Sequence, residues 1–234
     1  MSLIKACLPC PDCGSSDALA LYSDGTYCFS CKKHTHKLVF APNIPTITFH
    51  SPKNLDRCNF GSLPKEAIKW LKKYGLTDEE ISENKFSWDG TSNRLVYPIK
   101  NTNSVTGYEK REITGGTPKT ICQGRKVDSF HIIQPNKEEF KGVVAVEDII
   151  SAIKVGRVAK ALCLFGSQVS LSQYNEISRI TNLFILWLDL DKFNQAVKIA
   201  QKAKSFGIDT RIIKTDLDPK MYNTEEIRRT INEI

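Results

Sequence analysis

Four cysteines near the beginning of the chain have the types and spacing of a metal site. Cys10 and Cys13 form one C-x2-C pair. Cys28 and Cys31 form a second pair, after 14 intervening residues. Each pair can direct two thiolates at one ion, and two such pairs complete the tetrahedron that zinc prefers. Because four thiolates leave no position open for a substrate, we expect one structural Zn²⁺ here.

The residues between the two pairs predict a β-hairpin that brings them together. Residues 18–27 alternate loosely in polarity, and Asp24 followed by Gly25 is a turn signal. So short a segment has too small a core to fold without a metal, so the pattern indicates a zinc ribbon. Cys7 and His34 are spare potential ligands nearby, although the two matched pairs need neither.

Three acidic residues follow predicted strands. Glu147 comes directly after a strand at 142–146, and Asp189 and Asp191 follow an apolar strand at 183–188. Ligands of α/β sheets bind at the carboxyl ends of the strands. If the chain is extended there, Asp189 and Asp191 point the same way. Carboxylates gathered in this manner repel one another unless a hard cation binds, so we expect Mg²⁺ or Mn²⁺ at Glu147, Asp189 and Asp191.

Three further acids leave two interpretations open. Asp148, Asp216 and Asp218 also lie near the ends of predicted strands. They are either additional metal ligands or helix caps and solvated loop residues.

The elements that must position these acids alternate between strand and helix from residue 142 onward. We expect strands at 142–146, 160–165, 183–188 and 210–213, and helices at 149–155, 171–180, 195–206 and 225–234. Continuously apolar strands between helices indicate a parallel sheet covered on both faces. The predicted fold class is therefore a small zinc-ribbon β domain joined to an α/β domain with a parallel central sheet.

The middle of the chain divides into a linker and a basic segment. We expect a zinc ribbon at 1–36, a proline-containing linker at 37–63, a basic subdomain at 64–141 and the α/β domain at 142–234. Within the basic subdomain, a helix carries Ala67 and Leu71 on one face, a capping box begins at Thr77, and strands follow. The segment 115–120 superficially resembles a phosphate loop. Pro118 stands where that motif needs glycine, so we reject a P-loop.

Charge and composition narrow the class of partner. The 234 residues include 33 Lys and Arg against 26 Asp and Glu, for a net charge of +7. Residues 1–126 carry most of that excess, which favours an anionic partner such as nucleic acid. No apolar run approaches the ~20 residues of a membrane span, and no secretion signal is evident. We therefore expect no membrane and a reducing compartment for the eight cysteines.

These motifs together carry a resemblance to a known family. A glutamate after the first strand and Asp-x-Asp after a later one resemble the TOPRIM fold of topoisomerases and bacterial-type primases. Residues 10–17 and 23–31 resemble the N-terminal zinc domain of bacteriophage primase–helicases. The stretches 94–99, 107–111 and 118–119 are similar to the segment that precedes TOPRIM in those primases. The resemblance covers nearly the whole chain in the same order.

The resemblance implies a DNA primase, a nucleotidyltransferase that makes short RNA primers on single-stranded DNA during replication. It implies that the zinc domain engages the DNA template and that Glu147, Asp189 and Asp191 hold two Mg²⁺ or Mn²⁺ ions. The residues implied to bind template or ribonucleoside triphosphates are Arg94, Lys110, Arg111 and Lys119. A helicase would be a separate partner, and the expected location is the cytoplasm, of a bacterial host if the chain is phage-encoded.

Two departures keep other functions open. TOPRIM proteins usually have glycine directly after the glutamate, where this chain has Asp148. Phage members often have a glycine shortly after Asp-x-Asp, where this chain has residues 192–194, Lys-Phe-Asn. The alternatives are a non-catalytic scaffold that binds single-stranded DNA, as a degenerate primase or in the manner of a recombination mediator, and a TOPRIM nuclease.

Overall fold

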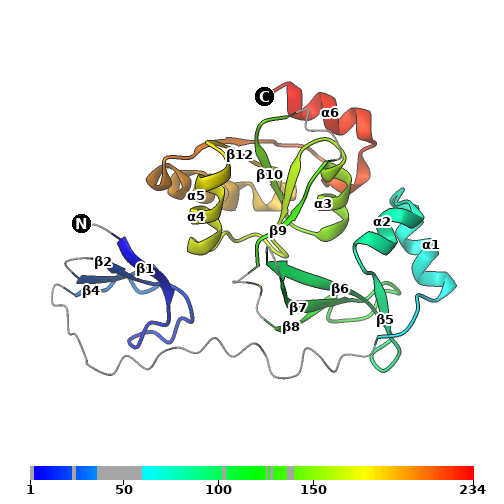
Figure 1. The fold of residues 1–234 in the computed structure, drawn as a ribbon, viewed down its shortest axis with the longest axis horizontal. Helices are drawn as coiled ribbons and strands as arrows, with labels where there is room; N and C mark the ends of the chain where they lie inside the picture. The colour runs from blue at the N-terminus through cyan, green and yellow to red at the C-terminus, as the bar shows by residue number, and fades with distance from the viewer. Residues whose placement is uncertain are drawn as a thin grey trace.

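The computed structural model describes most of the chain in two sheeted regions, one small and N-terminal and one larger (Figure 1). The described residues are 3–22, 25–35, 60–101, 104–124, 126, 129–135 and 140–234. Most of the predicted linker, Cys58 and the turn residue Asp24 lie outside these ranges.

The N-terminal region is an antiparallel sheet in the order β1-β2-β3-β4. Its strands are β1 (Leu3–Leu8), β2 (Leu19–Tyr22), β3 (Gly25–Cys28) and β4 (His34–Thr35). Strands β2 and β3 pair from Leu19 opposite Cys28 to Tyr22 opposite Gly25, which confirms the predicted hairpin. Strand β1, which was not predicted from the sequence, adds an outer strand against β2.

Two short helices follow, and both agree with their sequence signals. Helix α1 (Lys65–Lys73) buries Ala67 and Leu71. Helix α2 (Asp78–Glu83) begins at the predicted capping box. In it, the Thr77 hydroxyl accepts a hydrogen bond from the Glu80 N–H at 3.2 Å, and the Thr77 N–H donates to the Glu80 carboxylate at 2.9 Å.

A second antiparallel sheet occupies the middle of the chain in the order β5-β6-β7-β8. Its strands are β5 (Ser87–Asp89), β6 (Arg94–Asn101), β7 (Ser104–Arg111) and β8 (Thr120–Gly124). The segment 112–119 connects β7 to its antiparallel neighbour β8, with Arg111 opposite Thr120. A phosphate loop would join a strand to a helix, so this connection agrees with the rejection of a P-loop.

The third sheet has the order β13-β12-β10-β11-β9. Its strands are β9 (His131–Ile133), β10 (Val143–Val146), β11 (Lys160–Cys163), β12 (Leu183–Leu186) and β13 (Asp209–Ile212). Strands β10 to β13 are parallel, as predicted, whereas β9 pairs antiparallel with β11 at one edge. The sheet is therefore mixed and mostly parallel.

Helices cover both faces of this sheet (Figure 1). They are α3 (Ile149–Gly156), α4 (Leu171–Ile180), α5 (Phe193–Ala203) and α6 (Thr224–Asn232), with short 3-10 turns η2 (Leu190–Lys192), η3 (Lys204–Phe206) and η4 (Pro219–Met221). Ile153 and Ile227 pack on one face in a core shared with Tyr97 of the middle sheet. Tyr174 and Ile199 pack in a second core on the other face. Both faces of β10, β11 and β12 are buried, which explains why these strands are almost entirely apolar, whereas the edge strand β13 is partly exposed and polar.

No helix in the described part of the chain has the length and apolar character that crossing a membrane requires.

Candidate active site

The four predicted zinc ligands converge at one end of the N-terminal sheet. The Sγ atoms of Cys10 and Cys31 lie 3.9 Å apart, and those of Cys13 and Cys28 lie 3.7 Å apart. All four sulfur atoms lie within 4.8 Å of one another. A tetrahedron with Zn–S bonds of about 2.3 Å has edges of about 3.8 Å, so this donor set fits one structural zinc.

Backbone hydrogen bonds shape the two loops that present these sulfur atoms. The Cys10 N–H donates to Ser15 O at 2.8 Å, and the Gly14 N–H donates to Cys10 O at 3.0 Å. Gly14 has φ = +69°, a conformation that glycine adopts without strain. In the second loop, the Cys28 N–H donates to Lys33 O at 2.9 Å.

Glu147 and Asp189 meet at the carboxyl edge of the parallel strands. Glu147 follows β10, and its Oε1 accepts a hydrogen bond from the Asp189 N–H at 3.1 Å. Partial burial and the nearby Asp189 carboxylate raise the pKa of Glu147 above its ordinary value. This contact brings the Glu147 carboxylate to the backbone of Asp189.

Asp218 joins this pair from the segment after β13. Burial raises the pKa of Asp189 to about 6, and the nearby negative charge of Asp218 contributes to the rise. The sequence left the role of Asp218 open, and the structure places it in the acid cluster. We use "acid cluster" for Glu147, Asp189 and Asp218 together.

The position of Asp191 differs from the one predicted. The prediction that it points the same way as Asp189 assumed an extended chain, and that assumption is wrong because 190–192 form the 3-10 turn η2. Asp191 is exposed and forms an ion pair with its neighbour Lys192. Among the described residues, the cysteines are the one group of three or more potential ligands within 4.8 Å of one another, so Glu147, Asp189 and Asp191 do not form such a group.

Asp148 is a helix cap. Its carboxylate accepts hydrogen bonds from the N–H and hydroxyl of Ser151 at 3.0 and 3.2 Å, at the beginning of α3. The Lys220 ammonium lies 3.0 Å from the same carboxylate and also forms an ion pair with Asp218. Burial by itself would raise the pKa of Asp148, but the ion pair with Lys220 holds it below its ordinary value.

The predicted basic residues Lys110 and Arg111 point to opposite faces of the middle sheet, because they are adjacent in strand β7. The Lys110 ammonium lies 2.7 Å from the Asp89 carboxylate, and both side chains are largely buried. This ion pair holds the pKa of Asp89 well below its usual range. The Arg111 guanidinium is buried, with its carbon 5.5 Å from the centre of the Trp70 ring.

Arg94 and Lys119 differ in their exposure to solvent. Arg94 is 5% exposed, and its Nη1 donates to Pro118 O at 2.8 Å. Lys119 is exposed. Of the four predicted basic residues, Lys119 is therefore the one presented to solvent, and the other three make contacts within the protein.

Lys126 is a candidate residue that the sequence analysis missed. Its ammonium donates to Glu109 Oε2 at 2.5 Å and to Phe165 O at 3.0 Å. Gly166, the residue after Phe165, donates its N–H to the backbone oxygen of Glu147 at 3.0 Å. Lys126 thus links the middle sheet to the loop beside Glu147. A basic pair after a predicted strand was its sole sequence signal.

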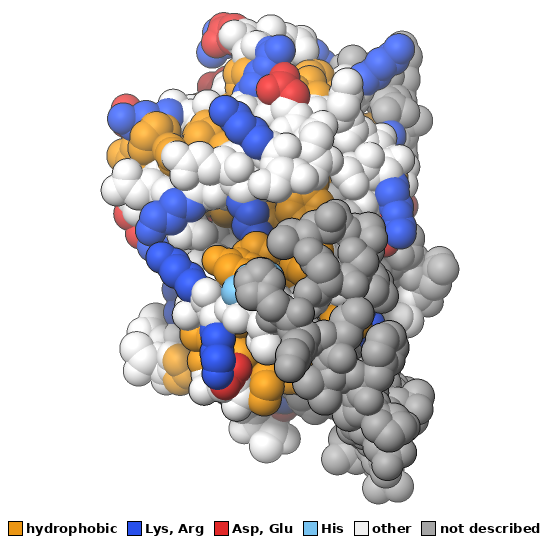
Figure 2. Space-filling model, turned by 90° about the vertical axis from the view of Figure 1, so that its left-hand side faces the viewer, with side chains coloured by type: hydrophobic (Ala, Val, Ile, Leu, Met, Phe, Trp, Pro, Cys, Tyr) orange, Lys and Arg blue, Asp and Glu red, His pale blue; other side chains and the backbone are white. Residues whose placement is uncertain are grey.

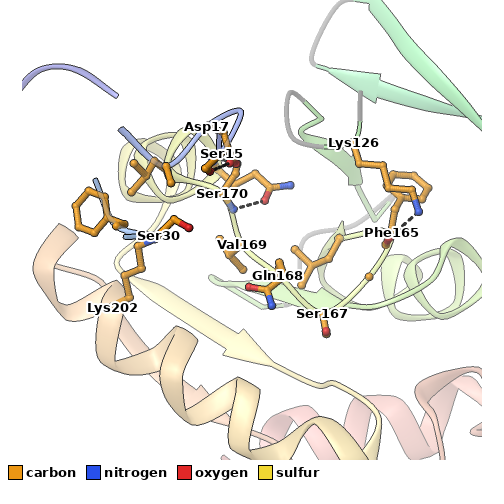
Figure 3. Close-up of a pocket in the computed structure, with 16 residues that line it drawn as sticks. Ser15, Asp17, Ser30, Lys126, Phe165, Ser167, Gln168, Val169, Ser170 and Lys202 are labelled. Carbon is orange, nitrogen blue, oxygen red and sulfur yellow. Dashed lines mark hydrogen bonds between the residues drawn. The ribbon is translucent and has the colours of Figure 1, made fainter. Parts of the chain in front are cut away.

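A cavity of about 540 Å³ lies between the N-terminal region and the loop after β11 (Figure 3). Lys126 and Lys202 lie at opposite ends of its lining. Its other polar lining residues are Ser15, Asp17 and Ser30 on the N-terminal side, Ser167, Gln168 and Ser170 on the loop, and Gln173 on α4. Hydroxyl, amide, carboxylate and ammonium groups therefore line a space that both regions share.

The described residues fold as a zinc-ribbon domain joined to a TOPRIM-type α/β domain, an arrangement that resembles solved primase structures. The chain matches the zinc binding and RNA polymerase domains of the Aquifex aeolicus primase with a TM-score of 0.64 and 17% identity, covering 100% of this chain and 80% of that chain.

Two further solved structures match 72% of this chain. The E. coli primase catalytic core has a TM-score of 0.59 at 18% identity, covering 72% of each chain. A DnaG primase catalytic domain bound to single-stranded DNA has a TM-score of 0.60 at 16% identity, covering 72% of this chain and 71% of that chain. No family model matches the chain, and no curated protein is similar to it in sequence.

Proposed function

We propose that this protein is a DNA primase that synthesises short RNA primers on a single-stranded DNA template. The observation that carries the proposal is the whole-chain likeness in fold to primase zinc-binding and RNA polymerase domains. The contact between Glu147 and Asp189 at the carboxyl edge of the sheet supports it, because this edge is where α/β sheets bind ligands.

The residues proposed to hold the divalent cations are Glu147, Asp189 and Asp191. Mg²⁺ and Mn²⁺ prefer oxygen donors, and such an ion would offset the mutual repulsion of the half-buried Glu147 and Asp189 carboxylates. Asp191, two residues after Asp189, would add a ligand from the exposed turn η2. Bound ions would supply a charged clamp for the oxygens of a phosphoryl group in transfer. The chain itself holds Glu147 in place through its hydrogen bond from the Asp189 N–H.

The proposed partners are single-stranded DNA and ribonucleoside triphosphates. Figure 2 shows Lys and Arg side chains spread over the face of the molecule on the side of the N-terminal region. Cationic side chains of this kind bind phosphates in a salt-dependent, sequence-tolerant manner. We assign this role to Lys119, which is exposed, and to Lys110, which would exchange its Asp89 partner for a phosphate. Arg94 and Arg111, which are buried, would support this surface through their contacts within the protein.

The test is primer synthesis by zinc-loaded protein on single-stranded templates of varied sequence, with labelled ribonucleotides and Mg²⁺ or Mn²⁺. We expect short RNA ladders that fall at least 100-fold in Glu147→Gln and Asp189→Asn, because each removes a proposed metal ligand. Glu83→Gln is the matched control, since it neutralises an exposed carboxylate at the end of α2 and should keep full activity. Product that survives both site substitutions together would overturn the site assignment.

The ion pairs of Lys192 with Asp191 and Lys220 with Asp218 favour one alternative, a non-catalytic scaffold that binds single-stranded DNA. In both pairs, a lysine already neutralises a carboxylate of the region. The same assay separates the two functions. Folded protein that binds single-stranded DNA but makes no primer with any template or metal, with or without an added replicative helicase, would support the scaffold and contradict the primase.

A further inference from the structure

A lysine is fixed between two acids beside the proposed metal site. The Lys220 ammonium lies 3.0 Å from Asp148 Oδ2 and also donates to Asp218 Oδ2, while its side chain is only 13% exposed. The backbone is fixed as well, because the buried Lys154 donates from its ammonium to the carbonyl oxygen of Lys220 at 2.7 Å. Both the side chain and the backbone of Lys220 are therefore held in place.

Asp148 anchors one side of this arrangement. Its carboxylate caps α3 through Ser151, so it cannot move toward a metal without uncapping the helix. On its other side, Lys220 contacts Asp218, whose negative charge acts on Asp189. One fixed positive charge therefore lies between the helix cap and the acid cluster.

We propose that Lys220 is the built-in counter-charge of the acid cluster, which holds Asp218 and weakens the binding of divalent cations at Glu147 and Asp189. Two physical effects lead to this result. The ammonium uses an Asp218 oxygen that a metal would otherwise ligate. Its charge also repels a second cation in a site where water screens poorly. The inference rests on the metal site of the proposed function.

The ion pair of Asp191 with Lys192 is more exposed than the ion pairs of Lys220. The Lys192 side chain is 39% exposed and that of Asp191 is 68% exposed, so solvent screens that ion pair. Lys220 is shielded, and it contacts two acids rather than one. For this reason we assign the control of metal affinity to Lys220.

The test is a calorimetric titration of zinc-loaded protein with Mn²⁺, in the absence of nucleotides and DNA. Lys220→Met should bind Mn²⁺ about tenfold more tightly than the unmodified chain, because a competing charge is removed. Lys204→Met is the matched control, since it removes the same charge from an exposed position in η3, before β13 begins, and its Kd should stay within twofold. A structural role for Lys220 would lower the melting temperature without tightening Mn²⁺ binding.

A second variant guards against misfolding of Lys220→Met. Asp148→Asn combined with Lys220→Gln removes both charges of the buried pair, keeps hydrogen-bonding groups at both positions, and should also bind Mn²⁺ more tightly. Equal or weaker binding in both variants, or no binding in any of the proteins, overturns the inference. Tighter binding without primer synthesis would retain the inference and contradict the primase proposal. Primer synthesis with an unchanged Kd would contradict this inference alone.

Discussion

His131 on β9 is a buried histidine with an unusual environment. It is 3% exposed, and no described residue accepts from or donates to its Nδ1. Burial, with a smaller contribution from the charge of Lys100, lowers the pKa of His131 to about 4. The folded protein therefore holds this imidazole neutral at pH values where an unfolded chain, with a histidine pKa near 6.5, would protonate it.

This difference predicts a loss of stability in mild acid. Below about pH 6.5 the unfolded state binds a proton at His131 that the folded state does not bind. The free energy of unfolding therefore falls as the pH falls toward 4. Between pH 7.5 and pH 5 we expect His131 to account for about 2 kcal/mol of that fall. Urea unfolding followed by tryptophan fluorescence measures it, because Trp70, Trp88 and Trp187 all lie outside the zinc ribbon.

The comparison variant is His131→Gln, whose loss between the two pH values should be about 2 kcal/mol smaller. His34→Gln, which changes an exposed histidine on β4, should leave the loss unchanged. Parallel pH profiles for the unmodified chain and His131→Gln would contradict the assignment.

At the scale of elements, α2 depends on its first residue. Thr77 and Glu80 satisfy each other's backbone N–H groups in the capping box, and Glu80 also lies 2.7 Å from the Arg157 guanidinium beside α3. One short helix therefore links the middle of the chain to the TOPRIM-type domain through its capping residues.

We expect Thr77→Ala to lower the free energy of unfolding by about 1 kcal/mol, because the Glu80 N–H loses its acceptor. Thr77→Ser keeps the hydroxyl and should keep most of the stability. Urea unfolding with fluorescence from Trp70, on the neighbouring α1, provides the measurement. An equal loss in the two variants would show that the hydroxyl does not cap the helix.

At the scale of the whole molecule, the zinc ribbon and the larger region have separate sources of stability. The larger region has two hydrophobic cores, whereas the buried hydrophobic residues of the ribbon are Cys10, Ala20 and Cys28. So small an apolar interior cannot offset the entropy of ordering the chain, so the ribbon depends on its metal. The contact of Lys202 with the Phe29 ring, at 5.1 Å, joins the two regions without supplying a core.

Removal of zinc should therefore unfold the ribbon alone. We expect one zinc per chain by metal analysis, and Cys13→Ser or Cys28→Ser should release it and expose the remaining thiols to modification. Tryptophan fluorescence of the larger region should stay native. Cys122→Ser, at an exposed cysteine of β8, is the control that should keep the zinc. Native protein without zinc, or loss of the native fluorescence in the ribbon variants, would contradict this separation.

The sequence predicted the elements well where a local pattern controls them. Helix α4 spans the predicted residues 171–180, and the predicted capping box at Thr77 is present. The predictions failed where pairing between strands distant in sequence determines the structure. Strand β9 is short and joins its sheet antiparallel at an edge, which no local pattern reveals. The apolar run 183–188 continues past the end of β12 because Trp187 and Leu188 are buried beyond the strand.

By itself, the sequence determined the zinc centre, since its four ligands lie within 22 residues and their spacing already defines two ligand pairs. It also placed Glu147 and Asp189 at one edge, because parallel strands end on the same side of a sheet. Only the tertiary structure decided which charges are neutralised. Lys220 meets Asp148 across 72 residues of sequence, and Lys110 meets Asp89 across 21. Such pairs depend on the packing of whole elements, which residue spacing does not encode.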